Sequence, residues 1–279
     1  MTSSLSRAMR TASVVLSAVV AVVATAVAAS TAGSTAAAAG PPDPIVYDAL
    51  GDSYASGYGV PPYTATCGQS DAAYPVQLDG RKHIALDDFA ACAGATTLTV
   101  VSDGQLEALN AQTDLVTISA GGNDTGWSTA VGACLLQDDQ TCELAADAVT
   151  ARIIALLPGR LDRLYTQLAA AAPNAHVVVT GYPRLFSPEY GAYLGASVAE
   201  QQTLNEGADL LNATMARAAA THGFQFVDVT KRFLGHGVNA PDAWILGLLD
   251  PGAFHPNAEG YETYTAAVTS AVNPSRLRS

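Results

Sequence analysis

Residues 45–54, Ile-Val-Tyr-Asp-Ala-Leu-Gly-Asp-Ser-Tyr, decide the fold. The first six form an apolar run that predicts a buried strand, and Gly51-Asp52-Ser53 predicts a sharp turn at its carboxyl end. Open α/β sheets place their chemistry at that edge. Ser53 is therefore a candidate nucleophile, which needs a base and an oxyanion hole from the rest of the chain. The alternative role for Ser53 is a helix N-cap, a position that serine favours.

Strand-like and helix-like segments alternate along the rest of the chain. The predicted strands are 45–50, 83–89, 114–119, 176–180 and 224–229. The predicted helices are 72–78, 104–109, 144–171 with a break near Pro158, 198–222 and 258–272. This alternation predicts one parallel sheet with helices on both faces, and right-handed crossovers bring all strand carboxyl ends to one edge. The loops 51–60, 92–97 and 120–127 lie at that edge and are expected to carry function.

The first 39 residues have the pattern of a signal peptide. Arg7 and Arg10 precede an uncharged apolar stretch over residues 14–29, and small-residue cleavage sites follow. The alternative is a membrane anchor, but the apolar stretch is near the short limit for a spanning helix. We therefore expect one secreted catalytic domain over residues 40–279, with no stable membrane anchor after cleavage.

The charge of the chain excludes some partners. Its formal net charge is −12, and without Arg7 and Arg10 the remaining domain carries about −14. Such an acidic surface repels nucleic acid and anionic membranes. We expect no nucleic-acid partner, and we expect a monomer.

Four cysteines in a secreted chain suggest two disulfides, for which three pairings exist. Cys134 and Cys142 flank the short polar segment 137–140, so we pair them and pair Cys67 with Cys92. A zinc site is the rival interpretation. It is disfavoured because no CxxC spacing exists and no histidine lies near these cysteines in the sequence, so we expect no metal.

Two further loops offer hydrogen-bond donors at the functional edge. Gly121-Gly122-Asn123-Asp124 follows a β-branched strand, and its glycines allow the backbone to approach a ligand closely. The Asn123 amide can donate to a developing oxyanion, although Asn and Asp also form ordinary turns. In the loop 92–97, the Gly94 N–H can point to the same oxyanion.

The base is sought among five histidines. His83 and His176 begin strands and lie at the wrong edge, and His222 ends a helix. His236 lies in a glycine-flanked loop and is a weaker rival. His255 precedes the last helix, where Pro256 restricts the backbone and Asn257 can cap the helix, so His255 is the predicted base.

These blocks together resemble a known family. Gly51-Asp52-Ser53-Tyr54, Gly94, Gly121-Gly122-Asn123-Asp124 and His255-Pro256-Asn257 occur in the order of the GDSL or SGNH hydrolases, over essentially the whole mature chain. The segment Gly181-Tyr182-Pro183-Arg184 is similar to that of the secreted actinobacterial lipases and esterases. The resemblance implies a three-layer, flavodoxin-like α/β/α sandwich with strand order 2-1-3-4-5.

The resemblance also implies the roles of the site residues. Ser53 would be the nucleophile and His255 the base. The oxyanion hole would consist of the Ser53 N–H, the Gly94 N–H and the Asn123 side chain, with no cofactor.

One departure concerns the group that orients His255. Many family members have Asp three residues before the histidine, where this chain has Gly252. The orienter is therefore expected to be the main-chain carbonyl of Gly252 or Ala253, with the Asp250 carboxylate as the rival.

The predicted function is a secreted serine esterase or lipase acting on a small-molecule or lipid ester. A carbohydrate O-deacetylase or a phospholipase of the same fold is the nearest alternative. A transferase that passes the acyl group to another alcohol is a further one, and a secreted binding module with an inactive hydrolase fold is another class of function.

Overall fold

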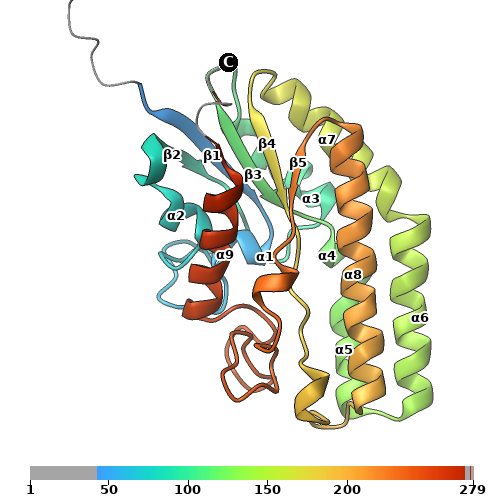
Figure 1. The fold of residues 1–279 in the computed structure, drawn as a ribbon. Coiled ribbons are helices and arrows are strands. Elements are labelled where there is room, and N and C mark those ends of the chain that lie inside the picture. The colour runs from blue at the N-terminus through green and yellow to red at the C-terminus, as the bar shows by residue number, and fades with distance from the viewer. Residues whose placement is uncertain (1–42, 274–276, 278–279) are drawn as a thin grey trace, which may run out of the picture. The chain divides into compact units, whose positions relative to one another are not determined.

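The structure is a computed structural model that describes residues 43–273 and 277, so the predicted signal peptide lies outside the described residues. Five parallel strands form one sheet in the order β2-β1-β3-β4-β5, which confirms the predicted order (Figure 1). The strands are β1 (Ile45–Gly51), β2 (Ile84–Phe89), β3 (Leu115–Ser119), β4 (His176–Thr180) and β5 (Gln225–Val227). All five lie within about three residues of the predicted ranges.

Helices cover both faces of the sheet, which confirms the three-layer sandwich (Figure 1). One layer holds α2 (Tyr74–Leu78) and α9 (Ala258–Ala271), and the other holds α3 (Thr97–Ser102), α7 (Leu157–Ala171) and α8 (Val198–Thr221). Because both faces are covered, the central strands β1 and β3 are buried almost throughout. Short 3-10 turns complete the connections at 81–83, 105–108, 188–190 and 230–232.

Several helices differ from the sequence prediction. The helix α3 forms where none was expected, and the expected helix 104–109 is the 3-10 turn at 105–108. A helix α5 (Trp127–Leu136) forms where none was expected, and α6 (Asp139–Ala155) begins five residues before the predicted start. Asp138 caps α6, accepting a hydrogen bond from the Thr141 N–H over 2.8 Å. The predicted break falls at Leu156, because Pro158 belongs to the first turn of α7, where its missing N–H is harmless.

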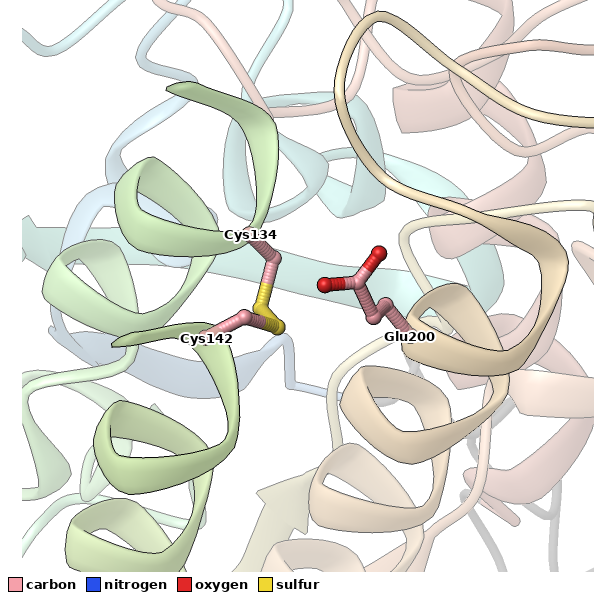
Figure 2. Close-up of side chains that lie close together, drawn as sticks. All are labelled: Cys134, Cys142 and Glu200. Atoms are coloured by element: carbon pink, nitrogen blue, oxygen red, sulfur yellow. A yellow bond between two sulfur atoms is a disulfide. The ribbon is translucent and has the colours of Figure 1, made fainter. Parts of the chain in front are cut away.

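Both predicted disulfides are present. Cys134–Cys142 joins the end of α5 to the start of α6, and Cys67–Cys92 joins two loops beside the carboxyl end of β1. Figure 2 shows the Glu200 carboxylate of α8 facing the first of these bridges. The two sulfur atoms are bonded to each other and are not thiolate ligands, while Glu200 accepts hydrogen bonds from the Ser197 N–H and hydroxyl within the capping box of α8.

Within residues 43–273 and 277, every helix is too short or too polar to cross a bilayer. The functional edge of the sheet is the carboxyl end of its strands. There the short helices α1 (Ser53–Ser56) and α4 (Gly122–Thr125) follow β1 and β3 directly.

Candidate active site

Ser53 lies at the first position of α1, directly after β1. The N-cap of that helix is Asp52, whose carboxylate accepts the Tyr54 N–H over 3.0 Å. The capping role considered for Ser53 therefore belongs to its neighbour, and the Ser53 hydroxyl is left to bond elsewhere.

The structure brings His255 to that hydroxyl. The His255 Nε2 lies 2.7 Å from the Ser53 Oγ, across 202 positions of sequence. This distance is within the hydrogen-bond reach that a serine nucleophile and its base need for acyl transfer. The ring is 8% exposed and lies near the rings of Tyr54, Tyr58 and Trp127, which leave it little freedom to turn.

Two glycines allow the serine loop and the histidine loop to meet. A Cβ on Gly252 would lie 2.4 Å from the Gly59 Cα, so the two backbones are in direct contact. Gly252 also has φ +87°, a conformation that other residues rarely adopt. A side chain at Gly252 would force the histidine loop away from Ser53.

The loop of His255 is held at both ends. The Leu246 N–H donates to the His255 carbonyl over 2.9 Å, and the Phe254 N–H donates to the Leu246 carbonyl over 2.9 Å. After the histidine, Asn257 caps α9 as the sequence predicted, accepting the Gly260 N–H over 2.9 Å.

Main-chain carbonyls lie at the other ring nitrogen. The His255 Nδ1 is 3.1 Å from the Gly252 carbonyl oxygen and 3.0 Å from that of Ala253. The Asp250 carboxylate instead accepts the Gly247 N–H over 2.8 Å, in the loop before the histidine. Either carbonyl can fix the tautomer with a proton on Nδ1, which leaves Nε2 as the acceptor facing Ser53.

We expect Asp250→Ala to keep kcat/KM for a short-chain p-nitrophenyl ester within about threefold of wild type, because the main-chain carbonyls at Nδ1 can orient His255 without this carboxylate. Asp250→Asn, which keeps an acceptor for Gly247, serves as the matched control. A loss of about 10⁴ in the alanine variant would instead identify Asp250 as the acid of a triad.

The electrostatics of the site suit a neutral base. Burial lowers the pKa of His255, and the two carbonyls at Nδ1 oppose that shift without reversing it. The imidazole is therefore neutral at neutral pH and able to accept the serine proton.

The loops of the predicted oxyanion hole lie beside the serine. The Cys92 N–H donates to the Gly51 carbonyl over 2.9 Å, which places the Gly94 loop against the end of β1. Asn123 donates from Nδ2 to the Ala95 carbonyl over 2.9 Å, so one amide hydrogen is used and the other remains. Among the described residues, the N–H groups of Ser53 and Gly94 have no hydrogen-bond partner, as expected of donors kept for an oxyanion.

Asp124, the residue after Asn123 in α4, anchors that short helix to its neighbours. Its carboxylate accepts the N–H and the hydroxyl of Thr97 over 2.9 and 2.7 Å, and it pairs with Arg160 at 3.1 Å. The buried carboxylate thus joins α4 to α3 and α7.

Other histidines do not approach Ser53. His236 stacks on Trp244 and bonds to the Asp242 carbonyl, and His222 pairs with Asp162 at the end of α8. His176 begins β4, at the opposite edge of the sheet from the serine. The rival base is therefore placed away from the reaction centre.

Sequence reasoning missed a set of tyrosine hydroxyls that join the site loops. The Tyr54 hydroxyl donates to the Phe254 carbonyl over 2.6 Å, next to His255. The Tyr261 hydroxyl, from α9, shares its single hydrogen between the carbonyls of Ser53 and Tyr58, at 3.1 and 2.9 Å. Only the position of Tyr54, one residue after the candidate nucleophile, could have signalled such a role.

A pocket opens beside Ser53 between α5, α6 and α8. Trp127 and Tyr182 are the aromatic side chains that line it beside Tyr54, whereas Phe186 and Trp244 do not. Phe186 packs in the core against Tyr193 and Phe254. The remaining lining is mostly apolar, with Ala130, Val131, Ala146, Val149, Ile153, Leu204 and Leu211 among its residues.

Comparison with known proteins agrees with the family resemblance seen in the sequence. A sequence model of the GDSL-like lipase/acylhydrolase family matches residues 49–263. Lipase 1 of Streptomyces coelicolor is 39% identical over 220 residues, which are 77% of this chain and 81% of that protein. Two crystal structures are each 36% identical and cover 81% of this chain and 99% of theirs. They are a phospholipase A1 from Streptomyces albidoflavus, with a TM-score of 0.76, and an extracellular lipase from Streptomyces rimosus, with 0.77.

Proposed function

Because this chain belongs to the GDSL-like lipase/acylhydrolase family and is a carboxylic ester hydrolase, we propose that it works through an acyl-enzyme on Ser53 with His255 as its base. The observation that carries this proposal is the 2.7 Å separation of the Ser53 Oγ and the His255 Nε2. Labelling of Ser53 by an organophosphonate, located by peptide mass spectrometry, tests it directly. Labelling at another residue would contradict it.

The reaction follows from that geometry. The His255 Nε2 takes the hydroxyl proton as the Ser53 Oγ bonds to the ester carbonyl carbon, and the carbonyl oxygen becomes an oxyanion. As the tetrahedral intermediate collapses, the carbon–oxygen bond to the alcohol breaks and His255 gives that alcohol the proton. Water then repeats the sequence, which releases the carboxylic acid and restores Ser53.

The oxyanion would be held by three donors. We assign these as the N–H groups of Ser53 and Gly94 and the second amide hydrogen of Asn123. The support is that all three belong to loops bonded to one another beside the nucleophile. The Cys67–Cys92 disulfide adds a covalent tie two residues before Gly94.

The apolar pocket favours an acyl chain longer than acetyl. Its walls are mainly aliphatic side chains from three helices, and Ser53 belongs to its lining. A fatty-acyl chain would bury its methylenes there, each contributing about 0.8 kcal/mol. This observation supports a lipase or a phospholipase over a carbohydrate O-deacetylase.

The names of the relatives leave both lipid classes open. One similar structure is described as a phospholipase A1 and another as a lipase, and both names imply attack on fatty-acyl esters. Rates on emulsified triglyceride and on phosphatidylcholine vesicles, measured with the same enzyme preparation, separate the two.

We expect Ala146→Phe, which fills the pocket from α6, to change chain-length preference. The ratio of kcat/KM for p-nitrophenyl decanoate to that for the acetate should fall about tenfold or more, because several methylenes lose their site. Ala148→Phe is the matched control, since Ala148 is exposed on the same helix and is not part of the lining. An equal loss on both esters would show that the pocket does not hold the acyl chain.

We also propose that the protein acts outside the cell. The support is the similar lipase described as extracellular, the two disulfides and the signal-peptide pattern of residues 1–39. Detection of a shortened chain in culture medium, with its new N-terminus sequenced, checks this proposal. That the protein is a monomer stays a prediction.

A further inference from the structure

Tyr182 follows β4 and places its hydroxyl between two catalytic loops. Its backbone is held by two hydrogen bonds to the Asn212 side chain of α8. The Asn212 amide accepts from the Tyr182 N–H and donates to the Tyr182 carbonyl, each over 2.8 Å. Its ring packs edge-on against Tyr54 with centroids 5.1 Å apart, and the side chain is 6% exposed. The hydroxyl is therefore held in a defined place.

That hydroxyl bridges two residues that lie 70 positions apart. The Gly122 N–H lies 3.2 Å from it and can only donate, so the tyrosine oxygen accepts there. The single hydroxyl hydrogen is then directed to the Asp52 Oδ2, 2.6 Å away. Gly122 is suited to this approach because a Cβ there would lie 3.2 Å from the Tyr182 ring.

The Asp52 carboxylate is in a state to accept that hydrogen. Its other oxygen accepts the Ser119 hydroxyl over 2.7 Å and the Tyr54 N–H over 3.0 Å, so all its contacts are donors to a carboxylate. Burial raises the pKa of Asp52 to about 6 although these donors lower it, and the group is ionised at neutral pH. Burial and the neighbouring Asp52 raise the pKa of Tyr182, so its hydroxyl stays protonated.

The two bridged residues each precede a group of the proposed oxyanion hole. Asp52 comes directly before Ser53, and Gly122 comes directly before Asn123. We infer that Tyr182 is a positioning residue whose hydroxyl fixes the Asn123 loop relative to the Ser53 loop, an inference that rests on the proposed function. Without it, the Asn123 amide would keep its bond to Ala95 but lose its fixed relation to the nucleophile.

The test is a double-mutant cycle between Tyr182→Phe and Asn123→Ala, measured on p-nitrophenyl butyrate. Tyr182→Phe alone should lower kcat by between about ten- and a hundredfold with KM nearly unchanged, because a misplaced donor affects the transition state more than the bound ester. In the Asn123→Ala background, the same change should cost less than about threefold, because the group it positions is already gone.

Tyr47→Phe is the matched control. It also removes a buried tyrosine hydroxyl, one bonded to the Thr117 hydroxyl at 2.6 Å within the sheet, and it should lower the melting temperature while kcat stays unchanged. An equal loss of kcat from Tyr182→Phe in both backgrounds would overturn the inference. So would an unchanged kcat in the single variant.

If Tyr182→Phe does not fold, Asp52→Asn disrupts the bridge from its other end. The same double-mutant cycle with Asn123→Ala then tests whether the bridge positions the Asn123 loop. Failure of both variants to fold would make the bridge a requirement of the fold, and would overturn a positioning role. The proposed function fails separately, through hydrolysis that persists without the Ser53 hydroxyl.

Discussion

Ser53→Ala and His255→Ala should each lower kcat for a short-chain p-nitrophenyl ester by about 10⁴ to 10⁶. The first removes the atom that would carry the acyl group, and the second removes the acceptor 2.7 Å from it. Because the two groups act as one unit, the double variant should be hardly slower than either single variant. Stopped assays with active-site titration measure these losses above the background rate.

Matched replacements on the same protein separate this effect from misfolding. Ser128→Ala removes an exposed serine of α5, and His236→Ala removes the rival histidine, which stacks on Trp244. Both should keep nearly full activity, and all four variants should melt near the wild-type temperature. A folded Ser53→Ala or His255→Ala variant with wild-type turnover would refute the assignment of these residues as nucleophile and base. A large loss of activity in His236→Ala would instead identify His236 as the base.

The strands of the sheet and the positions of Ser53 and His255 were predictable because the sequence patterns that indicate them are local. Each strand is a short apolar run, and a buried parallel strand must be apolar on both faces. Ser53 follows β1 immediately, and His255 is followed by a proline and a capping asparagine, so each shows its position within a few residues. The order of the strands then required the family resemblance, because apolar runs alone do not specify neighbours.

Helix α5 was missed for a physical reason. Its sequence combines Ala130, Val131, Ala133 and Cys134 with Gly132, and it lacks a polar face with helical spacing. It is stabilised by packing against α6 and α8 and by the Cys134–Cys142 bridge, which are long-range or covalent contacts. Local periodicity does not contain that information.

The tyrosine hydroxyls were missed because their partners are distant in sequence. Tyr54 bonds to Phe254 across 200 positions, and Tyr182 bonds to Asp52 across 130. From sequence alone, an aromatic residue indicates only packing. The choice among orienters of His255 depended likewise on which acceptor the folded loop presents to Nδ1, and Asp250 is turned toward its own loop.

Asn123→Ala should lower kcat by about 10² to 10³ while KM changes little. The amide has two hydrogens, and one of them is engaged by the Ala95 carbonyl at 2.9 Å. That bond holds the side chain in one orientation, so the second hydrogen is already placed before the ester arrives. A fixed donor stabilises the charge that develops in the transition state more than the neutral carbonyl of the bound ester, and the loss therefore falls on kcat.

The pair of Ser53 and His255 is intact in that variant, so the experiment separates loss of the oxyanion donor from loss of the nucleophile. Ser53 should still react with an organophosphonate, more slowly than in wild type, since the oxyanion-like oxygen of the adduct also loses a donor. Asn110→Ala is the matched control, because Asn110 has its amide in a turn with Gln112 near the start of β3, far from the edge that carries Ser53. If Asn123→Ala raised KM and left kcat unchanged, the amide would bind the ground-state ester only, and the oxyanion would rest on the N–H groups of Ser53 and Gly94 alone.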